Sequence, residues 1–302
     1  MVIRALWWLG RLGLGPALTR GYLGAIARFG PRGMPLVFRG YAPTPSDVFV
    51  CTFAKSGTNW AMQIVTQIAH HGAAEFGHVH ALVPWPEAPI QSMVAPLSAP
   101  VTSPTGLRAV KTHVPAAHVP LAEHARYLVV IRDPKDVFVS SLHFVSGIIN
   151  GIWAAPPALD DWHARFVEER FPLGSWVEHT AGWWALRDRD NVLVLTFADL
   201  HGDLPGAVAR VAEWMGVTLT PAALGAVVER SGFAWMKAHE AQFATPIPAI
   251  KGPRAVMIRQ GKRGGAASLL TAEQLAAIDQ VCRDGLRDRG SDLPYETLFG
   301  GA

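Results

Sequence analysis

Cysteine is nearly absent from this sequence, which has 2 cysteines among 302 residues. Cys51 and Cys282 lie far apart in the chain. Two such distant cysteines form neither a disulfide framework nor a cysteine-based zinc knuckle. This usage is typical of a protein from a reducing compartment.

Charge is also scarce, because only 17% of the residues are charged and the net charge is +3. The longest basic run that we find is Lys262-Arg263. A nucleic-acid-binding protein normally concentrates its basic residues, so we expect no nucleic acid partner. A small anionic ligand fits the modest basic surplus better. The 11 tryptophans indicate aromatic-lined pockets.

The N-terminal segment lacks an uninterrupted apolar run of the length that spans a membrane. The arginines that interrupt it are Arg4, Arg11, Arg20 and Arg28. In one interpretation, residues 1–30 make peripheral membrane contact, with Trp7 and Trp8 at the lipid headgroups. We favour a helix docked on the core, with glycines as packing notches, because glycine and proline weaken a free helix. We therefore expect a cytoplasmic protein.

Short apolar runs alternate with helical patterns along most of the chain. The expected strands are 48–53, 107–110, 127–131 and 192–197, and the expected helices are 58–71, 133–149, 174–186, 205–215, 221–230 and one beginning at 271. This order predicts an α/β fold with a central parallel β-sheet flanked by helices on both faces. We expect a single domain at 46–302, preceded by a helical, amphipathic extension at 1–45. Ligands should bind at the carboxyl ends of the strands.

The first of these strand ends carries Lys55-Ser56-Gly57-Thr58. A small-residue turn before a helix can surround an anion with backbone N–H groups, and a lysine adds a positive charge. The loop lacks the lysine–serine or lysine–threonine pair that ends an ATP-binding phosphate loop. It therefore predicts a phosphate-like group but neither ATP nor magnesium.

Two further strand ends carry polar residues. Lys111 and His113 lie two residues apart on one side of an extended segment, where a histidine can accept a proton at neutral pH. Arg132 follows the next strand, and Ser140 lies about two helical turns later. Arginine suits a phosphate, but a structural ion pair with a neighbouring aspartate is the alternative. Between the first two strands, residues 84–104 contain six prolines and predict a wall or lid over the site.

We weighed a metal site and expect none. Four histidines lie close together in sequence, namely His70, His71, His78 and His80. Zinc accepts histidine ligands, but this spacing matches no zinc motif, and the first two point to different helix faces. Asp188-Arg189-Asp190 mimics a metal-binding D-x-D motif, although a solvated helix end explains it equally well.

Taken in order, these motifs resemble those of the PAPS-dependent, cytosolic-type sulfotransferases, from about Asp47 to Gly264. The family patterns Y-P-K-S-G-T-T-W, K-T-H-x-P and R-x-P-K-D-x-x-V-S are matched by residues 53–60, 111–115 and 132–140. Residues 174–184 are similar to another stretch of the family. The chain looks like a bacterial-type member. The resemblance implies a P-loop nucleotide-kinase-like fold, PAPS as cosubstrate and PAP as product.

The resemblance also implies roles for individual residues. His113 would be the catalytic base, and Lys111 and Lys55 would stabilise charge on the transferring group. The residues implied to bind the cofactor are Lys55, Ser56, Gly57, Thr58, Asn59, Trp60, Arg132, Ser140, Phe197, Ser231, Phe233, Arg259, Gln260 and Gly261.

Three departures from the family pattern concern the nucleotide. Phe197 replaces a tyrosine, and Gln260 replaces a lysine, for which Lys262 or Arg263 would compensate. The tetrapeptide at 264–267 is Gly-Gly-Ala-Ala instead of Gly-Asp-Trp-Lys, which puts the closing of that loop in question. The oligomeric state stays open.

The expected function is sulfuryl transfer to a small, largely apolar alcohol or phenol. Aromatic residues in predicted loops favour such an acceptor, namely Trp85, Phe144, Trp153 and Phe243. One alternative is a non-catalytic nucleotide-binding or membrane-associated protein on the same fold. Another is an ATP-dependent kinase.

Overall fold

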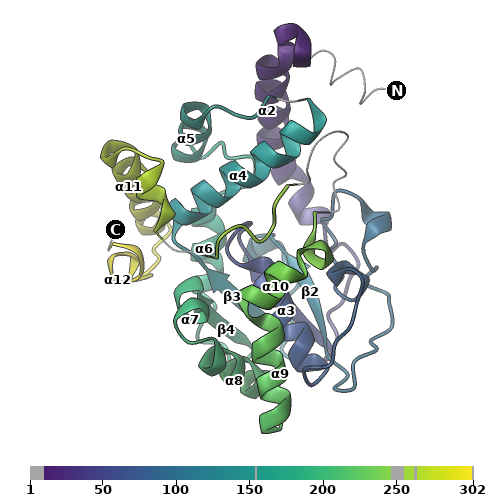
Figure 1. Cartoon of the computed structure of the whole chain (residues 1–302). Coiled ribbons are helices and arrows are strands. Elements are labelled where there is room, and N and C mark those ends of the chain that lie inside the picture. The colour runs from purple at the N-terminus through teal and green to yellow at the C-terminus, as the bar shows by residue number, and fades with distance from the viewer. Residues whose placement is uncertain (1–9, 154, 246–254, 262–263, 301–302) are drawn as a thin grey trace. The chain divides into compact units, whose positions relative to one another are not determined.

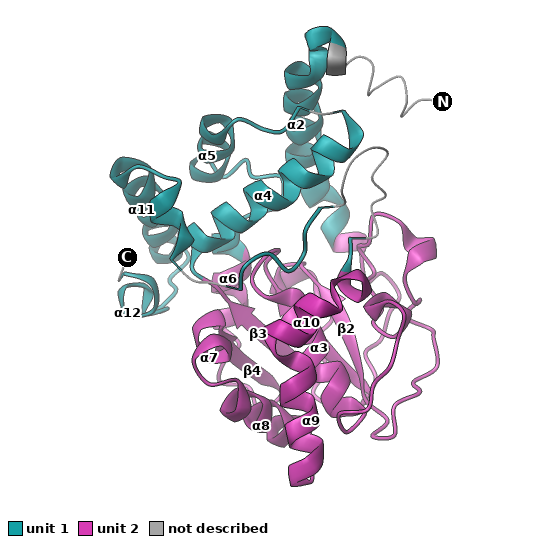
Figure 2. Cartoon of the chain, in the orientation of Figure 1, with its two compact units in different colours: residues 1–34, 133–178, 244–302 teal, residues 35–132, 179–243 magenta. Residues whose placement is uncertain are grey.

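The computed structural model describes residues 10–153, 155–245, 255–261 and 264–300 (Figure 1). These residues form two compact units (Figure 2). Unit 1 comprises 1–34, 133–178 and 244–302, and unit 2 comprises 35–132 and 179–243. Each unit is described by itself.

Unit 2 contains a sheet of four parallel strands in the order β2-β1-β3-β4. The strands are β1 (Asp47–Thr52), β2 (Arg108–Thr112), β3 (Arg126–Ile131) and β4 (Val192–Thr196). Every residue of β1 is buried, as a strand covered on both faces requires. The four expected strands are thus confirmed with shifted ends. The expectation that the second strand ends at residue 110 was wrong, because it continues to Thr112 and includes Lys111.

Helices of unit 2 cover one face of this sheet. They are α3 (Thr58–Ala69), α7 (Phe197–Gly202), α8 (Leu204–Met215), α9 (Pro221–Ser231) and α10 (Phe233–Ala238). Helix α3 packs directly on β1, β2 and β3, and α8 and α9 pack against α3. The apolar residues of α3 make this packing possible, since nearly the whole helix is buried.

The opposite face is covered by aromatic side chains. Phe49 of β1 stacks on Tyr127 of β3 with ring centres 5.1 Å apart. Tyr127 in turn lies 5.9 Å from the ring of Trp183, which belongs to α6 (Trp176–Trp184). The predicted α/β class, with a parallel sheet flanked by helices, is therefore confirmed.

Unit 1 is helical within the part of the chain that is described. Its helices are α2 (Gly15–Gly33), α4 (Pro134–Ile152), α5 (Leu159–Val167), α11 (Ala272–Asp288) and α12 (Tyr295–Phe299). Short helical turns elsewhere in the chain comprise a π-turn at Gly10–Leu14 and 3₁₀ turns at Met34–Leu36, Val79–Ala81, Gln91–Met93, Ala116–His118, Glu240–Phe243 and Gly265–Ser268. Helix α11 packs on α4 and α5.

The predicted helix starts in unit 1 are confirmed. Asp133 accepts a hydrogen bond from the Lys135 backbone N–H at 2.8 Å, and Pro134 is the first helical residue of α4. Thr271 and Gln274 form the capping box that opens α11. These side chains satisfy backbone groups that have no partner inside a helix.

Helix α2 packs through one face within unit 1. The Thr19 hydroxyl donates to the Ala155 carbonyl, and the Trp153 indole N–H donates to Thr19 at 2.7 Å. A helix packed within its unit is therefore confirmed for Gly15–Gly33. The expectation that its glycines serve as packing notches fails at Gly21, Gly24 and Gly33, where a Cβ would meet no atom within 4 Å, whereas Gly15 is buried. Trp7 and Trp8 lie outside the described residues.

None of the described helices combines the length and the apolar character that crossing a bilayer requires.

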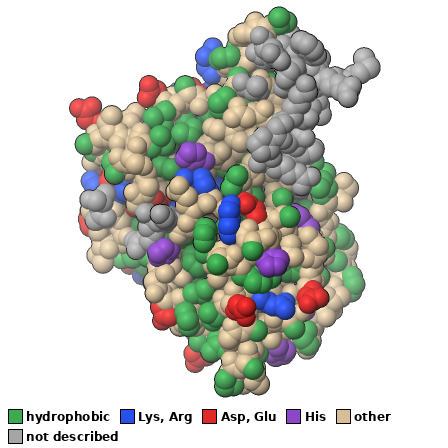
Figure 3. Space-filling model, in the orientation of Figure 1, with side chains coloured by type: hydrophobic (Ala, Val, Ile, Leu, Met, Phe, Trp, Pro, Cys, Tyr) green, Lys and Arg blue, Asp and Glu red, His purple; other side chains and the backbone are tan. Residues whose placement is uncertain are grey.

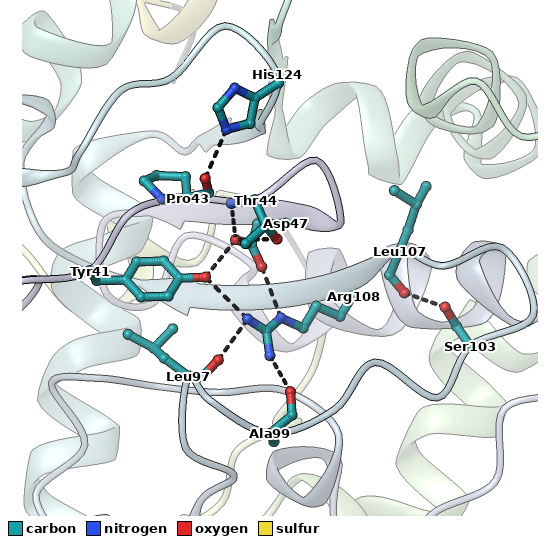
Figure 4. Close-up of polar contacts among 10 residues, drawn as sticks. All are labelled: Tyr41, Pro43, Thr44, Asp47, Leu97, Ala99, Ser103, Leu107, Arg108 and His124. Carbon is teal, nitrogen blue, oxygen red and sulfur yellow. Dashed lines mark hydrogen bonds and ion pairs between the residues drawn. The ribbon is translucent and has the colours of Figure 1, made fainter.

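A buried ion pair joins the start of β1 to the start of β2 and to the proline-rich segment (Figure 4). Arg108 Nε lies 2.8 Å from Asp47 Oδ1, and Asp47 is fully buried. The same guanidinium donates to the carbonyls of Leu97 and Ala99, each at 2.7 Å. Tyr41 donates its hydroxyl to the second Asp47 oxygen. The proline-rich segment is therefore tied to the sheet by a charged group whose donors are satisfied.

We expect Asp47→Ala to lower the free energy of unfolding by about 3–5 kcal/mol, because it leaves the Arg108 charge without its buried carboxylate. Equilibrium urea unfolding measures this change. The matched control is Asp284→Ala, which removes an exposed carboxylate beside Arg287 and should leave the urea midpoint near that of the parent protein. Equal midpoints for the two variants would contradict the importance of this ion pair.

Candidate active site

The parallel register brings four loops to one edge of the sheet in unit 2. Cys51 pairs with Thr112, Thr52 pairs with Val130, and Ile131 pairs with Thr196. The segments that follow β1, β2, β3 and β4 therefore begin at the same edge. These are the segments that carry most of the site residues expected from the sequence.

The loop after β1 has the backbone of an anion cradle. Lys55 and Gly57 both have positive φ, 73° and 99°. Helix α3 then begins at Thr58, and Gly57 supplies no side-chain cap, so N–H groups of the first turn are left for another acceptor. The Ser56 side chain is buried, and its oxygen has no hydrogen-bond partner among the described residues. A buried hydroxyl beside exposed N–H groups fits an anionic oxygen ligand.

Gly57 is required here by sterics as well as by its backbone angle. A Cβ at this position would lie 3.1 Å from Cδ2 of Phe197. Phe197 is the first residue of α7, so the expectation that it ends a strand was wrong. The capping box of Thr196 and Asp199 starts the helix one residue earlier than the apolar run suggests.

Arg132 and Trp60 complete this side of the loop. The Arg132 guanidinium lies 4.2 Å from the centre of the Phe197 ring and donates to the Lys55 carbonyl at 3.1 Å. Trp60 meets Phe197 edge to face, with ring centres 5.4 Å apart. The first loop, the end of β3 and the start of α7 thus form one aromatic and basic cluster.

Ser231 and Phe233 lie at the junction of α9 and α10. Ser231 is fully buried, and its hydroxyl has no partner within the described parts of the chain. Phe233, at the start of α10, is 43% exposed. The Gln63 side chain of α3 donates to the carbonyl of Arg230, so this junction packs on the helix that follows the anion loop.

The geometry of His113 fixes which of its nitrogens carries the proton. Nδ1 lies 2.7 Å from the carbonyl oxygen of Thr52, at the end of β1. A carbonyl only accepts hydrogen bonds, so neutral His113 carries its proton on Nδ1 and leaves the lone pair of Nε2 free. Burial and the nearby Lys111 charge hold the pKa of His113 well below its usual value. His113 is therefore neutral and able to accept a proton at neutral pH.

Lys111 is buried at the end of β2. Its Nζ lies 3.2 Å from the centre of the Trp85 ring. The pKa of Lys111 is lowered to about 7, because the effect of burial and the charge of Lys55 outweigh the opposing effect of the Glu87 carboxylate. The structure thus brings Lys55, Lys111 and His113 into one electrostatic cluster.

The remaining predicted cofactor residues belong to unit 1. Ser140 is half-buried on α4, and Arg259, Gln260 and Gly261 are exposed. The Gly264 backbone N–H donates to Asp136 of α4 at 3.3 Å, which ties this loop to the same helix. Burial lowers the pKa of His143, one turn beyond Ser140, and the Arg259 charge lowers it further. Lys262 and Arg263, the expected compensation for Gln260, lie outside the described residues.

At least three of the four clustered histidines form hydrogen bonds within the protein, including His78, whose Nδ1 accepts from the His80 backbone N–H at 3.2 Å. Nδ1 of His70 bonds to the Thr66 carbonyl, and Nδ1 of His80 bonds to the Val83 carbonyl. Burial lowers the pKa of His80 to about 3. The described part of the chain contains no group of three or more side chains placed to hold a metal ion.

Among the expected acceptor-site aromatics, Trp85 lies beside His113, with its ring 5.9 Å from that of the histidine. Phe243 is buried against Phe76. The placement of Phe144 and Trp153 in loops was wrong, because Phe144 belongs to α4 and Trp153 caps its C-terminus, bonded to Thr19.

Sequence reasoning missed Glu87. Its Oε1 accepts a hydrogen bond from the His113 backbone N–H. The available signal was a single carboxylate in the otherwise uncharged proline-rich segment. That segment lacks any periodicity that would have shown where the carboxylate points.

A family model described as the sulfotransferase domain matches residues 45–290. The chain belongs to the sulfotransferase family. It is 28% identical over 269 residues to sulfotransferase 1C2 of Oryctolagus cuniculus, covering 85% of this chain and 89% of the rabbit protein. It is 31% identical over 248 residues to human sulfotransferase 2B1, and the match covers 80% of this chain and 66% of the human protein. The expectation of a PAPS-dependent sulfotransferase is confirmed.

Solved structures with the same fold include retinol dehydratase in complex with androsterone and PAP. The two chains are 22% identical and match with a TM-score of 0.72. The match covers 90% of this sulfotransferase and 88% of the retinol dehydratase chain. Mouse sulfotransferase SULT7A1 with PAP matches with a TM-score of 0.65 and 18% identity. The match covers 85% of this chain and 89% of the mouse chain. These structures show the shared fold. The relatives named above are mammalian, so the comparisons give no support to a bacterial-type member.

Proposed function

We propose that this sulfotransferase moves the sulfuryl group of PAPS to the hydroxyl of a small, largely apolar alcohol or phenol. The observation that carries the proposal is the hydrogen bond from His113 Nδ1 to the Thr52 carbonyl. It orients a neutral base beside two lysines and a loop that fits an anion. This arrangement matches what transfer of a charged group to a hydroxyl requires.

The first loop is proposed to hold the 5′-phosphosulfate. Residues Lys55 to Thr58 offer backbone N–H groups, the unsatisfied Ser56 hydroxyl and a lysine charge. Trp60, Phe197, Ser231 and Phe233 are proposed to contact the adenine, with Asn59 beside them. Aromatic faces next to a buried hydroxyl suit a planar heteroaromatic ring.

Arg132, Ser140 and the Arg259-Gln260-Gly261 loop are proposed to bind the 3′-phosphate. Arginine offers a planar fork of donors that matches phosphate oxygens. The hydrogen bond from Gly264 to Asp136 supports this role for the loop, because it links the loop to the helix of Ser140 even though the following residues depart from the family pattern.

In the proposed reaction, PAPS supplies an activated sulfuryl group on an anhydride oxygen. His113 Nε2 takes the proton of the acceptor hydroxyl while the acceptor oxygen forms its bond to sulfur. The bond from sulfur to the bridging oxygen breaks in the same step, and its electron pair stays on that oxygen. Lys55 and Lys111 stabilise the charge that develops there and on the sulfuryl oxygens.

An apolar acceptor is supported by what surrounds the base. Trp85 lies against His113 and Lys111, and Phe53 meets the buried His179 with ring centres 5.9 Å apart. On the face that Figure 3 shows, basic side chains lie among acidic and apolar ones and form no continuous groove for a polyanion within the described surface. The retinol dehydratase structure noted above contains androsterone, a small hydroxylated molecule.

We also propose peripheral contact of residues 1–30 with an anionic membrane, in an otherwise cytoplasmic protein. Residues 1–46 contain six arginines and no acidic residue, whereas the rest of the chain has 21 Lys and Arg, which is 27 less these six, against 24 Asp and Glu. Tyr22 and Phe29, seven residues apart on α2, are both exposed. Arg28 and Arg32 lie beside the Phe29 ring. An exposed apolar face flanked by arginines suits anionic headgroups.

The first prediction concerns the base. We expect His113→Ala to lower kcat by about two to four orders of magnitude, because no base then takes the proton of the attacking hydroxyl. PAP affinity in calorimetry should stay near that of the parent protein. His124→Ala is the matched control, because His124 is an exposed histidine that hydrogen-bonds to the Pro43 carbonyl. Near-normal turnover by His113→Ala would remove the residue from this role.

The second prediction concerns the nucleotide and the rival functions. We expect PAP to raise the melting temperature more than ADP or AMP does at equal concentration, because only PAP carries a 3′-phosphate. Stabilisation by ADP with magnesium but not by PAP would favour an ATP-dependent kinase. Stabilisation by PAP with no transfer from labelled PAPS to any hydroxyl in an acceptor screen would favour a non-catalytic nucleotide-binding protein.

The third prediction concerns the membrane. We expect the protein to sediment with vesicles of phosphatidylcholine and phosphatidylserine but not with phosphatidylcholine alone. Replacing Arg20, Arg28 and Arg32 by glutamate should abolish sedimentation while leaving the turnover of a soluble acceptor unchanged. Equal sedimentation of the variant and the parent protein would contradict the proposal. If the parent protein is a dimer and the variant is a monomer, the exposed face binds a second copy of the chain instead.

A further inference from the structure

Glu87 reaches the catalytic cluster from the proline-rich segment. Its Oε1 accepts the hydrogen bond from the backbone N–H of His113, the residue proposed as the base. Its Oε2 is buried and meets no hydrogen-bond donor in good geometry among the described residues, although the Thr112 hydroxyl is close enough to lower the pKa of Glu87. A buried carboxylate oxygen without a partner is costly, so it calls for a functional reason.

The charges around this carboxylate supply that reason. Lys111 is buried on β2, and its backbone N–H donates to the Pro84 carbonyl at 2.9 Å. Its Nζ lies 3.2 Å from the centre of the Trp85 ring, so the segment that carries Glu87 packs against Lys111. The charge of Lys55 also acts on Lys111. The histidines nearby are His80 and His113, with His78 acting on His80 and His179 acting on His113. Burial lowers the pKa of His80, His113 and His179, so these three rings are neutral at pH 7.

Of the groups that act on Lys111, Glu87 alone favours its charged form. The pKa of Lys111 is lowered to about 7, because burial and the Lys55 charge outweigh the Glu87 carboxylate, which raises it. Burial raises the pKa of Glu87, and the Lys111 charge and the His113 N–H oppose that rise. Each group of this pair therefore stabilises the charge of the other.

We propose that Glu87 is a positioning residue that keeps Lys111 protonated and holds the backbone of His113 at the end of β2. The proposal rests on the proposed function, because it assumes that the Lys111 ammonium stabilises the transferring group. In this role the acceptor proton goes to the Nε2 lone pair of His113, and Glu87 acts only through its charge and its hydrogen bond to the His113 backbone.

The variant that separates the two parts of this role is Glu87→Gln. Its amide oxygen still accepts the backbone N–H of His113, but its negative charge is lost. Without that charge, the pKa of Lys111 falls, so the lysine loses its proton at a lower pH than in the parent protein. The active, protonated form is the one present below the pKa, so activity is lost as pH rises.

The experiment measures kcat/KM for PAPS from pH 5 to pH 9, since this quantity reports the ionisation of the free enzyme. We expect the basic limb of the profile to move down by about one unit or more in Glu87→Gln, the shift that loss of a close opposite charge typically causes. Glu75→Gln, at an exposed glutamate, is the matched control and should keep the parent profile.

A second background isolates Lys111. Arginine keeps its charge at every pH used, so in Lys111→Arg the basic limb should disappear and Glu87→Gln should shift nothing further. If Glu87→Gln instead lowers kcat/KM equally at every pH, Glu87 serves only to hold the backbone, and the charge proposal is overturned. If the parent protein transfers no sulfate from PAPS, the proposed function fails.

A second measurement follows the ¹³Cε resonance of Lys111 in lysine-labelled parent protein as pH changes. The resonance is assigned by its absence in Lys111→Arg. This measurement needs neither catalysis nor a folded Glu87 variant. We expect it to titrate near neutral pH. A midpoint close to that of a solvated lysine would show that Lys111 needs no carboxylate to stay protonated, and would overturn the inference.

Discussion

The hydrogen bond between His113 Nδ1 and the Thr52 carbonyl is the constraint on which the proposed chemistry depends. It joins the end of β2 to the end of β1, and it exists because the two strands pair in parallel register up to Cys51 and Thr112. A slip of one residue would turn every side chain of a strand to the other face of the sheet. The burial of β1 on both faces is therefore what ultimately fixes the tautomer of a histidine one residue beyond the sheet.

The same burial shapes the electrostatics of the cluster. A group in a poorly hydrated environment responds more strongly to neighbouring charges than it would in water. The nearby histidines His80 and His113 are neutral, so they add no positive charge around Lys111. The charged groups of the cluster are then Lys55, Lys111 and Glu87, and the pKa of Lys111 depends on the charges of the other two.

Much of the fold could be predicted because its strands are short apolar runs and its helices have identifiable caps. The convergence of the loops after β1, β2 and β3 follows from the rule that parallel strands end at one edge. Glu87 could not be found in this way, since residues 84–104 have no period that fixes side-chain direction. The role of the α2 glycines was also misjudged, because a sequence does not show whether a small residue faces a neighbour or solvent.

Gly57 and Phe197 are separated by 140 positions, yet the hydrogen atom of the glycine and the edge of the ring occupy the two sides of one contact. The turn at Gly57 would receive the phosphosulfate of PAPS, and the Phe197 ring is proposed to lie beside the adenine. These two parts of the nucleotide site are therefore in direct steric contact. A larger residue at position 57 would need both more room beside Phe197 and tolerance of the positive φ of 99°. Attempts to retool the donor preference of such an enzyme should therefore treat both positions as one design variable.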